Sequence, residues 1–290
     1  MFIDIHAHAY LFECPPQDGR TQFCTPEEVL KRYDELGIAK GILLPLIGPE
    51  VYLPQSNEEI LETCRRYPNR FIPFCNIDPR GIENSEFTDF TVWIEWYKNR
   101  GCKGIGEFMP NMYFRDPRVW NIFRQFEKAG MPVIFDDTVH VGRRYGLVDD
   151  PGLPQLEMTL RTFPKLILFG HGPAFWSEIG KLETVADRGG YPSYPISEEG
   201  AVPKLFRRYQ NLWGDLSAGS GYNALARDVD YAVKFLNEFQ DRLCFGTDIC
   251  YANQKLPLAE FLQNLRDSGK ISKAIFKKIA HENAERIFDL

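Results

Sequence analysis

The sequence predicts an α/β protein in which eight parallel strands close into a barrel surrounded by helices. Short apolar segments recur along all 290 residues, and helical segments separate them. Strands that are apolar almost throughout are typical of a parallel sheet covered on both faces. An open doubly wound sheet is the alternative, but it usually carries a glycine-rich loop after its first strand, and this chain has His-Ala-His there. We therefore expect one (β/α)8 (TIM) barrel domain over residues 1–290.

The predicted elements follow one another in regular order. Thr25 is expected to cap the first helix, with Pro26 at its first position and Gly37 just after its end. The segment from Asp116 to Gly130 repeats this design. Further helices are expected over 224–240, 257–267 and 272–288. The eight strands are expected over 2–6, 40–46, 71–77, 103–108, 132–136, 166–170, 211–216 and 243–248.

Polar side chains stand where these strands end. Active sites of such barrels are assembled from the C-terminal ends of the strands, so we expect these side chains to meet at one mouth. Three of the five histidines belong to this set. In strand order, the set comprises His6, His8, Asn76, Asp78, Arg80, Glu107, Asp136, Asp137, His171, Asp215, Ser217 and Asp248.

His6 and His8 in "FIDIHAHAY" are the first candidates for metal ligands. Residues i and i+2 of a strand share a face, which places the two Cα atoms roughly 7 Å apart. Two ring nitrogens can then converge on one ion at ~2.0–2.1 Å. The alternative is a pair of histidines hydrogen-bonded at an ordinary polar strand end. Together with His171 and Asp248, however, they form the nitrogen and oxygen donor set expected for zinc or a similar divalent ion.

Composition excludes several classes of function. The net charge of −6, with dispersed Lys and Arg, argues against a nucleic-acid partner. The seven cysteines contain no C-x-x-C pair, which is typical of reduced thiols and favours a cytoplasmic protein. No signal peptide precedes the first strand, and no apolar run of ~20 residues could span a membrane. We expect a small-molecule substrate, and the sequence leaves homo-oligomer formation open.

Three other features have both a functional and a structural interpretation. Arg80, just after the third strand, could clamp a substrate carboxylate or form a surface ion pair. Trp176 could wall a substrate pocket or pack in the core. The loop 189–201, rich in Gly, Pro and Tyr, could be a lid or a plain connection.

The order of these motifs resembles the amidohydrolase superfamily. The resemblance rests on His-x-His in the first strand, His171 in "GHGPAFWSEI" and Asp248 in "FGTD". More narrowly, the chain resembles the amidohydrolase-related branch that includes amino-carboxymuconate-semialdehyde decarboxylase, whose closing helix is similar to "KKIAHENAERIF". The resemblance implies a metal-dependent enzyme on a TIM barrel.

Two departures from the family pattern affect the metal site. Asp136 stands where the branch usually has a histidine; its harder oxygen donor favours manganese or magnesium, and His140 is an alternative ligand. Glu107 resembles a strand-four glutamate that bridges two metals in deoxyribonuclease-like members of the superfamily. The alternative for Glu107 is an ion pair with Lys103 or Arg143. One ion or two therefore remain open.

The leading functional hypothesis is hydrolysis of a small ester, lactone or amide by water activated on the metal. The resemblance implies that Asp248 accepts the proton of this water. His171 is the second base if it does not bind the metal. The alternative enzyme is a non-oxidative decarboxylase or hydratase of an aromatic-derived acid, which Arg80 as a carboxylate anchor would favour. A barrel that has lost its metal and its activity is a third hypothesis.

Overall fold

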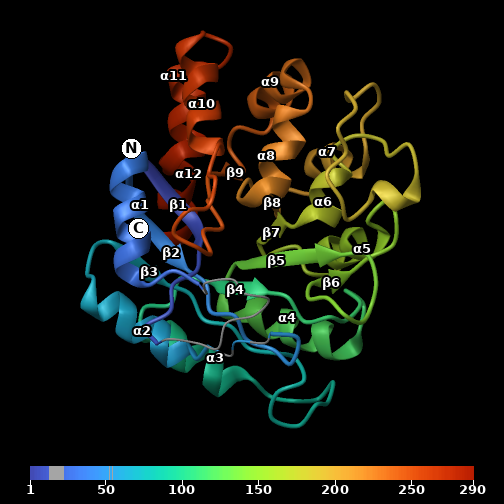
Figure 1. Cartoon of the computed structure of the whole chain (residues 1–290). Helices are drawn as coiled ribbons and strands as arrows, with labels where there is room; N and C mark the ends of the chain where they lie inside the picture. Colours follow the sequence, from blue (N-terminus) through green and yellow to red (C-terminus); the bar gives the residue numbers. More distant parts are fainter. Residues whose placement is uncertain (13–22, 52, 54) are drawn as a thin grey trace.

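The computed structural model describes residues 1–12, 23–51, 53 and 55–290, and eight of its strands follow one another around a barrel (Figure 1). Neighbouring strands within each sheet are parallel. A short additional strand, β6 (Leu147–Val148), pairs with β5 beside the barrel. The barrel strands are β1 (Phe2–Ala7), β2 (Ile38–Leu43), β3 (Phe71–Pro73), β4 (Ile105–Phe108), β5 (Val133–Thr138), β7 (Leu168–His171), β8 (Leu212–Asp215) and β9 (Leu243–Cys244).

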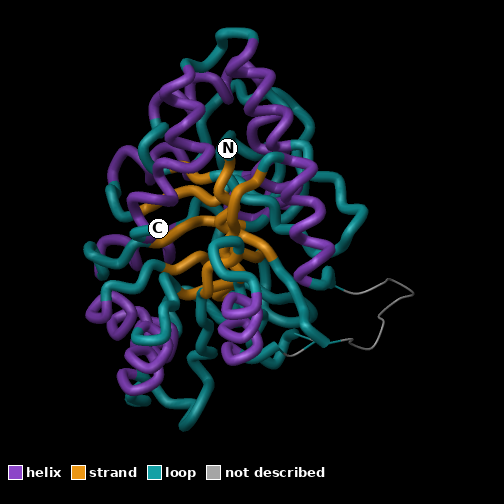
Figure 2. Tube along the Cα trace, turned by 90° about the vertical axis from the view of Figure 1, so that its left-hand side faces the viewer, coloured by secondary structure: helices purple, strands orange, loops and turns teal. Residues whose placement is uncertain are grey.

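Hydrogen bonding closes the barrel across two seams. The strands form two sheets, in the order β1-β2-β3 and β4-β5-β7-β8-β9. A parallel bridge between Cys75 and Ile105 joins β3 to β4. At the other seam, Ala7 bridges Ile249, and the Ile5 N–H donates to the Phe245 carbonyl oxygen at 3.1 Å. The predicted barrel is confirmed, and Figure 2 shows its strands in the middle with helices around them.

The helices form the outer layer. Thr25 accepts a hydrogen bond from the Glu28 N–H at the start of α1, and Gly37 ends this helix with φ = 71°, as expected. The helices are α1 (Pro26–Leu36), α2 (Asn57–Arg66), α3 (Thr91–Lys98), α4 (Pro117–Ala129), α5 (Pro154–Thr162), α6 (Pro173–Ser177), α7 (Ala201–Arg208), α8 (Ala218–Ala226), α9 (Val229–Glu238), α10 (Leu258–Asp267), α11 (Lys273–Lys277) and α12 (Asn283–Phe288).

Two of the predicted helices are interrupted. The segment expected as one helix over 224–240 is divided between α8 and α9, because Asp228 adopts an extended conformation. Its side chain accepts a hydrogen bond from the Tyr231 N–H and so begins a new helix. The segment 272–288 likewise contains a π-helical turn, Lys278–Glu282, between α11 and α12.

The apolar core has two parts. One cluster fills the barrel, with Ile3, Ile5 and Phe169 among its members, and Phe288 of α12 packs against it. The larger cluster lies between the strands and the surrounding helices. The pairing of β1 with β2 shifts register between Asp4 and Ala7, which allows His6 to face the barrel interior after Ile5. The apolar filling therefore ends where the histidines begin.

The structure can be compared with two expectations drawn from the composition, on membrane-spanning helices and on cysteines. No helix in the described ranges is long and apolar enough to cross a membrane. The cysteines within those ranges carry free thiols, and Cys14 lies outside them.

Candidate metal centre

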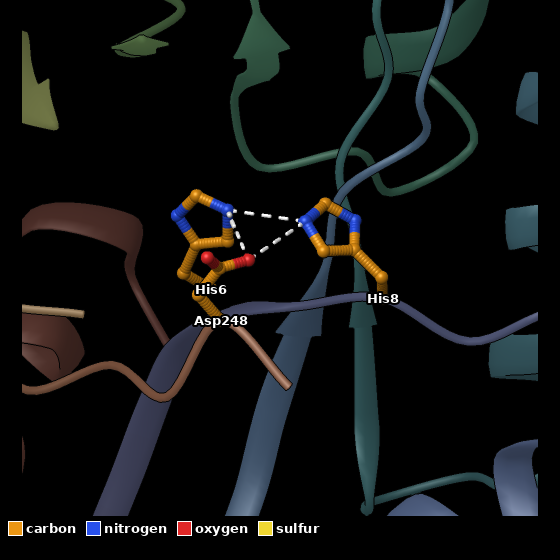
Figure 3. A group of neighbouring side chains, drawn as sticks. All are labelled: His6, His8 and Asp248. Atoms are coloured by element: carbon orange, nitrogen blue, oxygen red, sulfur yellow. Dashed lines mark hydrogen bonds and ion pairs between the residues drawn. The ribbon is translucent and has the colours of Figure 1, made fainter. Parts of the chain in front are cut away.

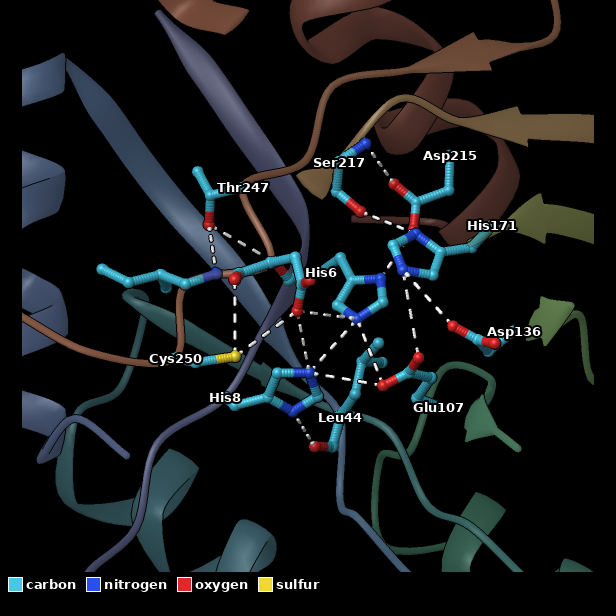
Figure 4. Close-up of polar contacts among 12 residues, drawn as sticks. His6, His8, Leu44, Glu107, Asp136, His171, Asp215, Ser217, Thr247 and Cys250 are labelled. Atoms are coloured by element: carbon cyan, nitrogen blue, oxygen red, sulfur yellow. Dashed lines mark hydrogen bonds and ion pairs between the residues drawn. The ribbon is translucent and has the colours of Figure 1, made fainter. Parts of the chain in front are cut away.

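Seven of the polar side chains predicted at the strand ends meet at one mouth (Figure 4), whereas Asp137 pairs with Arg188 and Asp78 with Arg80. His6 and His8 come from β1, and Asp248 follows β9. Glu107, Asp136, His171 and Asp215 come from β4, β5, β7 and β8, respectively. All are buried except Asp248, whose side chain is 24% exposed. Three histidines and four carboxylates therefore converge in a largely buried site.

His6, His8 and Asp248 form the first donor group (Figure 3). The two Nε2 atoms are 3.2 Å apart, and Asp248 Oδ1 lies 3.6 Å from His6 Nε2 and 3.3 Å from His8 Nε2. Ligands of a tetrahedral ion with bonds of ~2.0–2.1 Å are about 3.4 Å apart. The three atoms are therefore spaced as the ligands of one divalent ion would be.

Glu107 also lies beside the same two histidines. Its Oε2 atom is 3.6 Å from His6 Nε2 and 3.5 Å from His8 Nε2 (Figure 4). The alternative partners expected from the sequence do not contact it: Lys103 lies beside Asp289, and Arg143 forms no ion pair with any described residue. Glu107 is therefore available as a further oxygen ligand.

Glu107, Asp136 and His171 form the second donor group. His171 Nε2 lies 3.9 Å from Glu107 Oε1 and 4.0 Å from Asp136 Oδ2. Glu107 thus presents one oxygen to each donor group, and these wider spacings leave room for a second ion. His140, the alternative ligand to Asp136, lies on an exposed loop and belongs to neither group.

The charges at the mouth are unbalanced without a cation. Within the described ranges, no Lys or Arg forms an ion pair with Glu107, Asp136 or Asp248. Burial raises the pKa of Asp136, and the Glu107 charge raises it further. Burial alone would lower the pKa of His8, but Asp248 and Glu107 outweigh it and raise the pKa to about 9. Buried carboxylates whose only cationic partners are protonated histidines fit a divalent cation, which would take the place of the ring protons.

Hydrogen bonds at Nδ1 orient the rings of the first donor group. His6 Nδ1 lies 2.6 Å from Asp215 Oδ2, and His8 Nδ1 lies 3.0 Å from the Leu44 carbonyl oxygen. Such partners hold the proton on Nδ1 and leave Nε2 free to bind a metal. The sequence placed Asp215 at the mouth but assigned it no role. The Leu44 carbonyl has no signal in the sequence at all.

The two residues expected to bind substrate have other partners. The Arg80 guanidinium donates to Glu50 at 2.6 and 2.7 Å and to Asp78 at 2.8 and 2.5 Å, which is the ion-pair alternative. The Trp176 ring is buried in the core, and its Nε1–H donates to the Asp215 carbonyl oxygen at 2.8 Å. Neither side chain offers a free surface to a substrate.

A cavity of about 500 Å³ lies beside Asp136. Arg143 and Arg144 line it and form no ion pair within the described part of the chain, and Tyr145 stands next to them. The negative charge of Asp136 raises the pKa of Tyr145, which indicates that the phenol lies near the metal centre. The loop expected as a lid contributes Gly189. Sequence reasoning did not place Arg143, Arg144 and Tyr145 at a cavity, because nothing in "GRRYG" indicates what these side chains face.

Comparison with known proteins places this site in context. The family model described as Amidohydrolase matches residues 3–290. A TIM-barrel protein from Bordetella bronchiseptica is similar over 99% of this chain and 98% of its own, with a TM-score of 0.67 and 17% identity. No curated protein matched the sequence.

Two further structures resemble the chain with similar TM-scores and sequence identities. One, from Acinetobacter baumannii, is described as a probable 2-pyrone-4,6-dicarboxylic acid hydrolase (TM-score 0.61, 16% identity, 100% of this chain and 99% of that one). The other is 5-carboxyvanillate decarboxylase from Sphingomonas paucimobilis (TM-score 0.63, 16% identity, 100% and 99%). Hydrolysis and decarboxylation thus both occur on this fold. Because the family model covers nearly the whole chain, and the barrel and its mouth agree with it, the protein belongs to the amidohydrolase family.

Proposed function

We propose that the protein is a metal-dependent hydrolase of a small organic acid that contains an ester, lactone or amide bond. The observation that carries the proposal is the first donor group: two Nε2 atoms and one carboxylate oxygen within 3.2–3.6 Å of one another. His6, His8 and Asp248 would hold the ion, with Glu107 as the fourth ligand. Zinc suits this set best, since it contains two imidazoles. A second, harder ion such as manganese would use Glu107, Asp136 and His171.

A divalent ion in this place would supply Lewis acidity, which lowers the pKa of water and polarises a carbonyl group. The chain's own residues would supply the proton transfers. Asp248 is the only partly exposed carboxylate of the first donor group, and we assign it as the base that takes a proton from the attacking water. The same side chain would then pass the proton to the leaving group. His171 serves as a second base when the second donor group is empty.

Substrate recognition is assigned to Arg143 and Arg144. Both line the cavity beside Asp136, and both lack an ion-pair partner among the described residues, whereas Arg80 is occupied by two carboxylates. Unpaired guanidinium groups bind carboxylates well. The two named structural relatives are described as acting on carboxylic acids, which supports an anionic substrate here.

The reaction can be tested with two assays on zinc-loaded and manganese-loaded protein. Lactones and esters that bear a carboxylate are followed by the acid they release, and aromatic carboxylic acids by the carbon dioxide they release. We expect acid release that needs the metal and disappears in Asp248→Asn. Metal-dependent release of carbon dioxide without ester or lactone cleavage would instead establish the decarboxylase alternative and overturn the proposal.

The substrate assignment has its own variants. Replacing Arg143 or Arg144 by Ala removes charged hydrogen bonds worth ~1.5–3 kcal/mol each, so KM for an anionic substrate should rise about 10–100-fold. KM for a neutral ester and the metal content should not change. Arg124→Ala is the matched control, because Arg124 is also exposed, has no ion pair with a described residue and lies on α4 beside a different groove. Equal KM values in all three variants would contradict the assignment.

A further inference from the structure

Asp215, at the end of β8, is completely buried, and its two carboxylate oxygens have different partners (Figure 4). Oδ1 accepts a hydrogen bond from the Ser217 N–H at 3.0 Å. Oδ2 lies 2.6 Å from His6 Nδ1 and 3.2 Å from His171 Nδ1. The Trp176 Nε1–H donates to the Asp215 carbonyl oxygen at 2.8 Å and so holds the backbone in place. One carboxylate oxygen therefore contacts a histidine from each donor group.

An ionised carboxylate can only accept hydrogen bonds, so His6 donates through Nδ1–H, and the proton of His171 is also favoured on Nδ1, which faces Asp215 Oδ2 and Ser217 Oγ. The Nε2 lone pairs of His6 and His171 are then left to face the first and second donor groups. We propose that Asp215 is a positioning residue that sets the metal-binding tautomer of both histidines through this single oxygen. The inference rests on the proposed metal-dependent function and extends it, because it predicts that one residue outside both donor groups controls both.

The two histidines depend on Asp215 to different degrees. Ser217 Oγ lies 3.0 Å from His171 Nδ1 and offers that ring a second acceptor. His6 Nδ1 has Asp215 as its only hydrogen-bond partner within the described part of the chain. Loss of the carboxylate should therefore disturb His6 more than His171.

Replacing Asp215 by Asn separates geometry from charge, because the amide has nearly the shape of the carboxylate. The Ser217 N–H needs an acceptor, so it selects the amide oxygen for the Oδ1 position. The amide NH2 then faces His6 Nδ1, which becomes an acceptor, and the His6 ring proton moves to Nε2. The opposite amide orientation would place two buried N–H donors against each other, at a cost of ~1–3 kcal/mol. In the favoured orientation, His6 cannot bind a metal, whereas Ser217 Oγ can still accept the Nδ1 proton of His171.

The test compares zinc affinity of the full chain by chelator competition in wild type, Asp215→Asn and Ser220→Ala. Ser220→Ala is the control, since it removes a buried hydroxyl that has no hydrogen-bond partner among the described residues. Loss of an outer partner of a metal-binding histidine typically lowers affinity ~10–100-fold, and we expect at least that for Asp215→Asn. The control should match wild type. Equal affinity in wild type and Asp215→Asn would overturn the proposal.

A second measurement reads the tautomers directly. In protein with 15N-labelled histidine, long-range 15N–1H NMR spectra distinguish Nδ1–H from Nε2–H, and only five histidines must be assigned. Zinc-loaded wild type should carry the proton on Nδ1 of His6 and His171, and zinc-saturated Asp215→Asn should carry it on Nε2 of His6. If Asp215→Asn does not fold, Nε2–H on either ring of wild type still overturns the inference. Failure of wild type to bind zinc would instead overturn the proposed function.

Discussion

Asp136 and Asp137 are neighbours on β5, yet their side chains enter opposite surroundings. Asp137 Oδ2 accepts a hydrogen bond from Arg188 at 2.8 Å, and the same guanidinium donates to Glu178 at 2.6 Å. This closed cluster of Arg188, Asp137 and Glu178 contains its own cation. Asp136 faces the metal centre, where its nearest charged neighbours are Glu107 and His171 and where no described Lys or Arg side chain pairs with it.

This difference shows that the chain supplies a cationic partner for Asp137 but not for Asp136. Burial raises the pKa of both aspartates, but Arg188 acts against this at Asp137, whereas Glu107 adds to it at Asp136. An unpaired buried carboxylate costs several kcal/mol. Because Asp137 pairs with Arg188 and Asp136 forms no ion pair with a described Lys or Arg, we infer that the charge at Asp136 is balanced by a bound cation. Each prediction below changes one side of this comparison.

The largest effect is expected from His6→Ala combined with His8→Ala. The change removes both nitrogen donors of the first donor group, so zinc affinity should fall more than ~1000-fold. Chelator competition measures the affinity, and urea unfolding with chelator present measures the metal-free stability. That stability should fall, because buried Asp215 and Glu107 lose their histidine partners, but the protein should stay folded because Ile3 and Ile5 continue to fill the barrel. Zinc content equal to the parent's would contradict the ligand assignment.

Arg188→Met should destabilise the protein by about 3–5 kcal/mol, because it leaves Asp137 and Glu178 buried without their cation. The measurement is the free energy of unfolding in urea. Arg144→Met is the control: this side chain is exposed and unpaired within the described ranges, so the change should stay within ~0.5 kcal/mol. Similar losses in the two variants would show that the closed cluster contributes no special stability.

Replacing Asp136 or Asp137 by Asn should change the stability of the metal-free protein in opposite directions. Asp136→Asn replaces a buried carboxyl group whose pKa is raised by burial and by the Glu107 charge, so the change should stabilise the protein. Asp137→Asn weakens the contact with Arg188 and turns an amide toward the Oδ1 position, which has no described partner, so it should destabilise by ~1–3 kcal/mol. With manganese bound, the Asp136→Asn effect should become destabilising. Stability changes of the same sign in the two metal-free variants would contradict the difference proposed between Asp136 and Asp137.

The last prediction concerns the protons that zinc binding releases. His8 in the metal-free protein has a pKa of about 9, so its ring is protonated at pH 7 and must lose that proton to bind zinc. Zinc affinity should therefore rise up to ~10-fold per pH unit between pH 7 and 9 for each proton released, and level off above the His8 pKa. Calorimetry in buffers of different ionisation enthalpy counts these protons. Zinc binding that releases no proton at pH 7 would contradict the charge imbalance described here.

The sequence was sufficient for the features that depend on local pattern. Strand periodicity placed His6 and His8 on one face, and strand ends brought Asp248 and His171 to the same mouth. The caps of α1 followed from Thr25 and Gly37. Each of these depends on residues close together in the chain or on the regular geometry of the barrel.

The features that the sequence did not predict depend on distant partners. Arg80 is bound by Glu50, thirty residues away, which periodicity cannot reveal. The His8 partner is a backbone carbonyl, and every residue has one. Asp228 resembles many other surface aspartates until its extended backbone divides α8 from α9. The family resemblance singles out Asp136 in "PVIFDD", but nothing in the sequence shows that Arg188 pairs with Asp137.

The most direct test of the central claim is elemental analysis of the purified protein combined with anomalous diffraction from its crystals. We predict at least one divalent ion per chain, located among His6 Nε2, His8 Nε2 and Asp248 Oδ1. A second ion, when present, should lie among Glu107, Asp136 and His171. Protein that has been equilibrated with zinc and manganese and still holds no ion at the first donor group, or holds it elsewhere, would contradict the account.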